Sequence, residues 1–73
     1  MKNVLVTGAT GFIGSNLAIA LVRGGYRVRI LRRQNSDLRA IGNADVEHAI
    51  GDIRDEEAVR RAVKGCDTVF HAA

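Results

Sequence analysis

Three glycines at intervals of three, Gly8, Gly11 and Gly14, stand near the start of the chain inside the stretch TGATGFIG, residues 7–14. An apolar run precedes this stretch and an amphipathic segment follows it. Glycine at such a junction allows a sharp turn, lets a phosphate approach the backbone, and lets a helix pack closely on a strand. The placement predicts a cradle for the phosphates of a nucleotide, and a glycine-rich turn without a ligand is the alternative.

The stretch divides into expected roles. Gly8 makes the turn, Gly11 leaves room for a pyrophosphate, and Gly14 brings the helix close to the strand, while the first amides of the helix donate to the anion. No Gly-Lys-Ser or Gly-Lys-Thr follows, which excludes a nucleoside-triphosphate cradle with a lysine at the terminal phosphate. The predicted binding residues here are Gly8, Thr10, Gly11, Phe12, Ile13 and Gly14.

The rest of the chain alternates strands with helices. Short apolar runs predict strands at 3–7, 26–32, 46–51 and 68–73, and apolar residues at helical spacing predict helices at 12–23 and 55–65. Residues 37–42 offer at most a short helix. Asp55 is expected to cap the second helix, and Glu57 to pair with Arg61 one turn later. This order with short connections predicts an α/β fold with a parallel sheet in the strand order 3-2-1-4.

Size and composition fit one small domain. The chain has 73 residues, a net charge of +3 and a single cysteine, Cys66, which cannot form an internal disulfide. No apolar run approaches the ~18–20 residues that a membrane span needs. We therefore expect a soluble cytoplasmic protein without a membrane partner.

Three motifs together resemble one known family. TGATGFIG, GDIRD at residues 51–55 and DTVFHAA at residues 67–73 resemble motifs of the extended short-chain dehydrogenase/reductase family. That family contains NAD(P)-dependent nucleotide-sugar epimerases and dihydroflavonol-reductase-like enzymes, which run to several hundred residues. The resemblance covers residues 1–73 and implies an N-terminal fragment: half of a Rossmann-type doubly wound dinucleotide-binding domain, truncated after the fourth strand.

The end of the second strand bears on the choice of cofactor. In NAD-preferring relatives an acidic residue here accepts hydrogen bonds from the adenosine ribose and repels a 2′-phosphate. This chain has Arg32 and Arg33 instead, and guanidinium groups can hold a phosphate with two hydrogen bonds. The predicted cofactor is NADP in preference to NAD, and a solvated basic strand end is the alternative. Asp37 is expected to form a turn or to cap a helix rather than to bind ribose.

The resemblance also assigns residues near the third and fourth strands. Asp52 would accept from the exocyclic amine of adenine, and Ile53 would line the ring with its side chain and amide. From the residues alone, Asp52 could equally cap a helix. Ala72 and Ala73 would leave room for contacts between the cofactor and the backbone. His71 is a weak candidate for a catalytic residue, and we expect instead a packed histidine that donates to the backbone.

Catalytic residues are not expected in this chain. The family uses a Tyr-x-x-x-Lys pair, whereas the only tyrosine here is Tyr26 and Ile30 stands at the lysine position. No nucleophilic triad or metal-ligand cluster replaces the pair. We interpret the chain as the NADP(H)-binding portion of an oxidoreductase or epimerase, inactive by itself.

The sequence leaves two other functions and one partner open. Six arginines between Arg23 and Arg39 would suit a small basic nucleic-acid-binding module, although aromatic residues for base stacking are scarce and no nucleic-acid motif is present. A chain whose only property is folding is a further alternative. The fourth strand carries no lysine or proline that would protect a sheet edge, so we expect a homo-oligomer formed through that edge.

Overall fold

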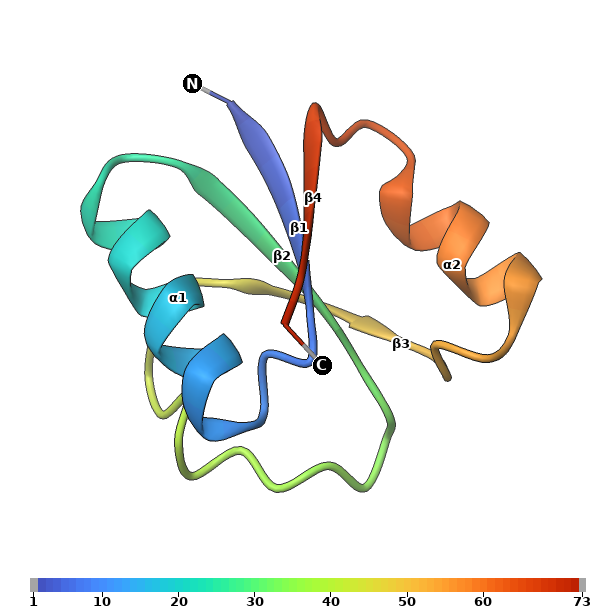
Figure 1. Cartoon of the computed structure of the whole chain (residues 1–73), viewed down its shortest axis with the longest axis horizontal. Coiled ribbons are helices and arrows are strands. Elements are labelled where there is room, and N and C mark those ends of the chain that lie inside the picture. Colours follow the sequence, from blue (N-terminus) through green and yellow to red (C-terminus); the bar gives the residue numbers. More distant parts are fainter. Residues whose placement is uncertain (1, 73) are drawn as a thin grey trace.

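The structure is a computed structural model that describes residues 2–72, so Met1 and Ala73 lie outside it. The described residues form four strands and two helices (Figure 1). All strand pairs are parallel, and the sheet order is β3-β2-β1-β4. This confirms the predicted fold class and strand order. The elements are β1 (Asn3–Thr7), α1 (Phe12–Arg23), β2 (Arg27–Arg32), β3 (Glu47–Ile50), α2 (Glu56–Val63) and β4 (Thr68–His71).

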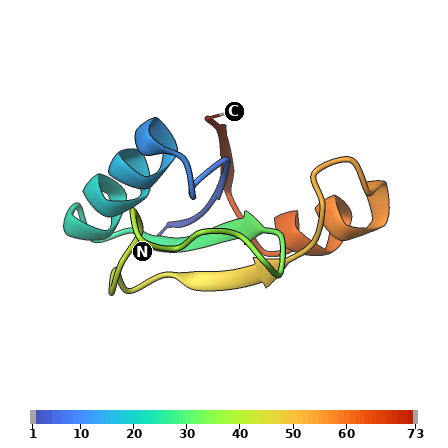
Figure 2. The same cartoon turned by 90° about the horizontal axis from the view of Figure 1, so that it is seen from below.

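The two helices cover opposite faces of the sheet, as Figures 1 and 2 show. Side chains of a strand alternate between its faces, and on β1 Val4 and Val6 face α1 while Leu5 faces α2. All three are at most 1% exposed. Burying each contributes roughly 1.5–3 kcal/mol. Coverage on both sides explains why β1 reads as a continuous apolar run.

The long connection from β2 to β3 packs on the face that α1 covers. Ile41 is 2% exposed and Leu38 packs beside it, so this segment adds to the same apolar cluster. Residues 37–42 do not form a helix. The Asp37 carboxylate instead accepts from the amide and side chain of Arg39, which makes a turn and confirms the turn predicted at Asp37.

Helix α2 is fixed at both ends. Asp55 accepts a hydrogen bond from the amide of Glu57 and caps the N-terminus as predicted. At the other end Arg29 of β2 donates from Nη1 to the carbonyls of Ala62 and Lys64, each at 2.7 Å. These contacts satisfy carbonyl groups that a helix leaves free and tie α2 to the sheet.

Several predicted bounds and one predicted ion pair need correction. The helix expected over 55–65 spans Glu56–Val63, because Asp55 is its cap and the backbone of Lys64 is extended. The strand expected from residue 26 begins at Arg27, because the amide of Tyr26 donates to the carbonyl of Leu21 and closes the end of α1. The strand expected over 46–51 spans Glu47–Ile50, and the one expected over 68–73 ends at His71 among the described residues. The predicted ion pair of Glu57 with Arg61 is wrong, since Arg60 pairs with Glu57 and its neighbour Glu56.

Neither helix within residues 2–72 is long and apolar enough to cross a membrane.

Candidate cofactor-binding site

A cavity of about 420 Å³ lies where β1, β2 and β3 end. Because the strands are parallel, their carboxyl ends meet at one edge of the sheet, and the loops that follow them form the walls. Its lining residues are Thr7, Gly8, Thr10, Leu31, Arg32, Arg33, Ser36, Gly51, Asp52, Ile53 and Arg54.

The first wall is the glycine turn after β1. Gly8 has a φ of +74°, a left-handed conformation that favours glycine. A Cβ on Gly14 would lie 2.0 Å from the carbonyl oxygen of Gly8, so the close contact of α1 with the turn requires a glycine there. A Cβ on Gly11 would have that oxygen as its nearest neighbour, at 3.6 Å. Gly14 therefore serves the packing, whereas the fold places no such demand on Gly11.

Helix α1 begins with unpaired donors. Its N-cap, Gly11, makes no side-chain cap hydrogen bond, and its first turn contains no acidic residue. The amides of Phe12, Ile13 and Gly14 have no acceptor within residues 2–72. Helix α2, in contrast, has an aspartate cap and two glutamates in its first turn. The start of α1 is thus the helix terminus left free to attract an anion.

The second wall follows β2 and contains both predicted arginines, whose side chains differ. Arg32 donates from Nε to Nδ1 of His48 at 2.9 Å, and from Nη1 to the carbonyls of Arg33 and Gln34. Its guanidinium therefore braces the turn after β2. The Arg33 guanidinium makes no hydrogen bond or ion pair with residues 2–72, and this residue is exposed.

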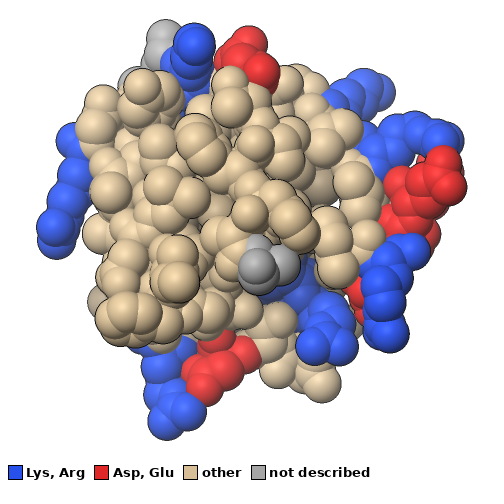
Figure 3. Space-filling view, in the orientation of Figure 1, with Lys and Arg blue, Asp and Glu red and all other residues tan. Residues whose placement is uncertain are grey.

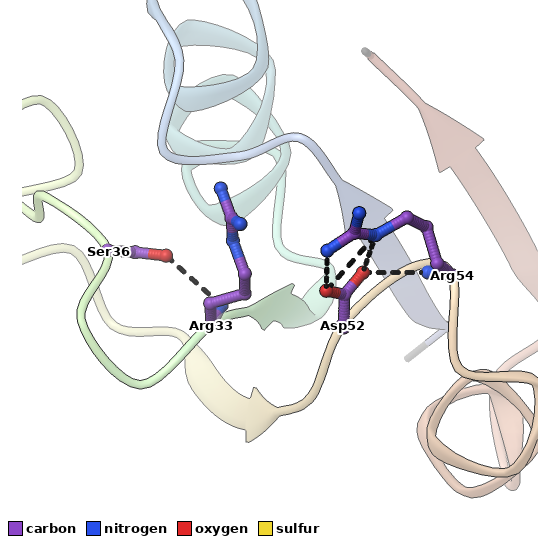
Figure 4. A network of polar contacts seen from close by, with 4 residues as sticks. All are labelled: Arg33, Ser36, Asp52 and Arg54. Atoms are coloured by element: carbon purple, nitrogen blue, oxygen red, sulfur yellow. Dashed lines mark hydrogen bonds and ion pairs between the residues drawn. The ribbon is translucent and has the colours of Figure 1, made fainter.

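Ser36 completes this wall. Its hydroxyl oxygen accepts a hydrogen bond of 3.0 Å from the amide of Arg33, which closes the loop so that both residues border the cavity. Figure 4 shows the Arg33 side chain between Ser36 on one side and Asp52 and Arg54 on the other.

The third wall is the GDIRD segment after β3. Asp52 holds Arg54 through both carboxylate oxygens, with Nη2 to Oδ2 at 2.7 Å and Nε to Oδ1 at 3.1 Å (Figure 4). Hydrogen bonds from the Arg54 side chain and amide, together with the charge of Arg33, lower the pKa of the Asp52 carboxyl well below its ordinary value. Ile53 beside them is 49% exposed. Asp52 does not cap α2, because Asp55 does so.

The structure gathers half of the predicted binding residues at this cavity. Gly11, Phe12, Ile13 and Gly14 adjoin it at the start of α1 but do not line it. Ala72 follows β4 and donates from its amide to the carbonyl of the lining residue Thr7 at 3.0 Å, but does not itself line the cavity, and Ala73 is outside the described residues. Sequence reasoning missed Ser36 and Arg54. The repeated acid-x-arginine spacing at 52–54, also found at 37–39, was a signal for Arg54. The predicted residues on the lining are Gly8, Thr10, Arg32, Arg33, Asp52 and Ile53.

His71 does not behave as predicted. It is exposed rather than packed, and its Nδ1 lies 2.6 Å from the hydroxyl of Thr7 instead of donating to the backbone. Its position at the end of an edge strand explains the exposure. No group of three His, Cys, Asp or Glu side chains within residues 2–72 could hold a metal ion.

A parallel sheet of this order, with a glycine turn after its first strand and a cavity at its carboxyl edge, defines a Rossmann-like nucleotide-binding domain. The sequence model of the NAD dependent epimerase/dehydratase family matches residues 4–73. The chain therefore belongs to that family. The match supports a nicotinamide dinucleotide as the cofactor.

Individual relatives agree with this assignment. The chain is 45% identical to sterol demethylase protein B of Methylococcus capsulatus over 69 residues, which are 94% of the chain and 21% of that protein. An epimerase from Methanothermobacter thermautotrophicus matches 99% of the chain with 41% identity and a TM-score of 0.85. A short-chain dehydrogenase/reductase superfamily protein from Agrobacterium tumefaciens with bound NAD matches 97% with 32% identity and a TM-score of 0.75.

The last two matches cover 22% and 20% of those chains. The chain thus spans about a fifth of the length of the relatives it matches.

Proposed function

We propose that this chain binds the adenosine side of NADP in the cavity at the carboxyl edge of the sheet, as the cofactor-binding portion of an oxidoreductase or epimerase. One observation carries the proposal. A single cavity brings together a glycine turn, a free arginine and an aspartate from the ends of three different strands. These are the groups that a pyrophosphate, a ribose phosphate and an adenine would need.

We assign a part of the cofactor to each wall of the cavity. Gly8, Thr10 and Gly11 would lie against the pyrophosphate, with the amides of Phe12 and Ile13 as donors. Absence of an acid in the first turn of α1 favours that role electrostatically. Adenine would lie at Asp52 and Ile53, where an acceptor oxygen adjoins an exposed apolar side chain.

The choice of NADP over NAD rests on Arg33. Its guanidinium has no partner within residues 2–72 and borders the cavity, so it can bind a ribose 2′-phosphate without breaking another contact. The Ser36 hydroxyl beside it can donate to the same phosphate while accepting from the Arg33 amide. Arg32 acts indirectly in this proposal, by holding the turn. Asp37 is bound to Arg39 and does not line the cavity.

The chemistry assigned to this portion is binding and orientation. When bound, the cofactor supplies a hydride donor or acceptor. This sequence has no Tyr-x-x-x-Lys pair, so an acid/base pair for that reaction would come from elsewhere in the protein. No observation favours the alternative of a nucleic-acid surface. On the face of the molecule shown in Figure 3, Lys and Arg side chains are spread around the periphery, with Asp and Glu among them.

Calorimetric titration of the chain with NADPH and NADH tests the proposal. We expect tighter binding of NADPH, and Arg33→Ala should weaken it at least about tenfold because a charge-assisted contact is lost. NADH affinity should stay unchanged. Arg39→Ala is the matched control, since this arginine lies in the same connection but outside the cavity. Equal affinities for the two dinucleotides, or equal effects of the two substitutions, would overturn the NADP assignment.

A further inference from the structure

We propose that Arg54 is a positioning residue that fixes the Asp52 carboxylate as an acceptor for the amino group of adenine, and so determines which base the cavity accepts. This inference rests on the proposed function, because it requires the base of a dinucleotide at Asp52. It extends to Arg54, which was not among the binding residues predicted from the sequence.

The first support is the number of contacts between the two residues. The amide of Arg54 donates to Oδ1 of Asp52 at 2.9 Å, and its guanidinium reaches Oδ1 from Nε and Oδ2 from Nη2. One residue thereby holds the carboxylate from its backbone and from two side-chain nitrogens. Rotation of the carboxylate would break these contacts together, so its orientation is set before any ligand binds.

The second support is the acceptor capacity that remains. A carboxylate offers about four acceptor positions. Two bonds at Oδ1 and the short bond at Oδ2 occupy three of them, with a longer contact of 3.3 Å from Nε to Oδ2. The Asp52 side chain is 30% exposed and lines the cavity. One position on Oδ2 is therefore left for a donor from a ligand.

The chemistry of that position distinguishes purine bases. An ionised carboxylate only accepts hydrogen bonds, and Arg54 with Arg33 keeps Asp52 ionised. Adenine presents an amino donor at its sixth position, whereas hypoxanthine presents a carbonyl oxygen there. Two acceptors facing each other repel and leave both unpaired. The fixed carboxylate consequently favours adenine.

Charge gives the third support. A carboxylate alone in a cavity for an anionic dinucleotide would repel the phosphates. Arg54 offsets that charge within the cavity wall, since both residues line it. The pair presents an acceptor for the base without a net negative charge at the site.

The test compares NADPH with reduced nicotinamide hypoxanthine dinucleotide phosphate, which differs only at the base, by calorimetry. The unmodified chain should prefer NADPH by about tenfold or more, the value of a hydrogen bond to a charged group. Arg54→Gln should reduce this preference to about threefold or less. Arg60→Gln is the control, because that exposed arginine also pairs with carboxylates but lies on α2 outside the cavity.

A further variant separates positioning from charge. Arg54→Lys keeps the positive charge without the planar two-nitrogen contact, so the preference for adenine should also fall. A preference that survives in Arg54→Gln or Arg54→Lys, with circular dichroism showing a folded chain, overturns the inference and leaves the proposed function standing. If the unmodified chain binds NADPH without any preference for its base, the inference is likewise overturned and the proposed function stands. Failure of the unmodified chain to bind either dinucleotide overturns both.

Discussion

Alanine substitutions at Gly14 and Gly11 should have opposite consequences, although both glycines belong to one short loop. At Gly14 the new Cβ would lie 2.0 Å from the Gly8 carbonyl oxygen, 2.6 Å from the carbonyl carbon and 2.9 Å from the Cα of Ala9. All three are backbone atoms, so relief requires α1 to move away from the turn. Overpacking of this kind costs about 1–3 kcal/mol or more. The better helix propensity of alanine returns about 1 kcal/mol.

We expect Gly14→Ala to lose a net 2 kcal/mol or so, since the contacts involve backbone and exceed an ordinary overpacking. A domain of this size holds only about 3–5 kcal/mol in its core, so a large share of its stability would go. Gly11 has a φ of −79° and a nearest contact of 3.6 Å. Gly11→Ala should therefore change the free energy of unfolding by less than about 1 kcal/mol.

Urea denaturation followed by circular dichroism measures the free energy of unfolding of both variants. Titration with NADPH measures the affinity of Gly11→Ala for the cofactor. Gly11→Ala should remain folded yet bind NADPH at least about tenfold more weakly, because its methyl group occupies the path of the pyrophosphate. Equal stabilities of Gly14→Ala and Gly11→Ala would refute the packing role of Gly14. Undiminished NADPH binding by Gly11→Ala would refute the phosphate role of the loop.

Three further predictions concern stability and association. Arg29→Met should lower the free energy of unfolding by about 2–3 kcal/mol, because the carbonyls of Ala62 in α2 and of Lys64 at its C-cap lose a charged donor. Arg27→Met, at an exposed position, should be near neutral in the same urea titration. Equal losses in the two variants would contradict the role of Arg29. The stability advantage of the unmodified chain over Asp52→Asn should be full at pH 6 and shrink as pH falls below about 5, since the folded-state pKa of Asp52 lies below its unfolded value of about 3.9; urea midpoints at pH 6 and pH 3 check this, and an advantage that grows in acid would be the wrong sign. The 73-residue chain should self-associate at micromolar concentration through β4, whose Val69 is 49% exposed, and Val69→Lys should yield monomers in sedimentation; a monomeric unmodified chain would exclude this edge as an interface.

The sequence was sufficient for the elements whose signals are local. Helix α1 begins after a glycine loop and β1 is buried on both faces, and both were predicted with their correct bounds. The start of β2 was not, because the hydrogen bond of Tyr26 that closes α1 depends on how the helix ends in three dimensions. The partner of Glu57 was missed for a similar reason, since two arginines stand at helical spacing from it.

The candidate site divides in the same way. Glycine spacing and the GDIRD segment pointed to two walls of the cavity, but Ser36 joins the site only through the loop that its bond to Arg33 closes. The different environments of Arg32 and Arg33 could not be predicted, because the two neighbouring residues are the same in the sequence. They follow from where β2 ends and from which side chain reaches His48 on the neighbouring strand.

The central claim is that the cavity at the carboxyl edge of the sheet binds the adenosine side of NADP. Amide chemical shifts of the ¹⁵N-labelled chain during titration with NADPH test it most directly, because they locate binding residue by residue. We expect saturable shifts concentrated at Gly8, Arg33, Ser36 and Asp52. Shifts confined to residues around Arg29 and Arg61, which do not line the cavity, or no shifts at millimolar NADPH, would contradict it.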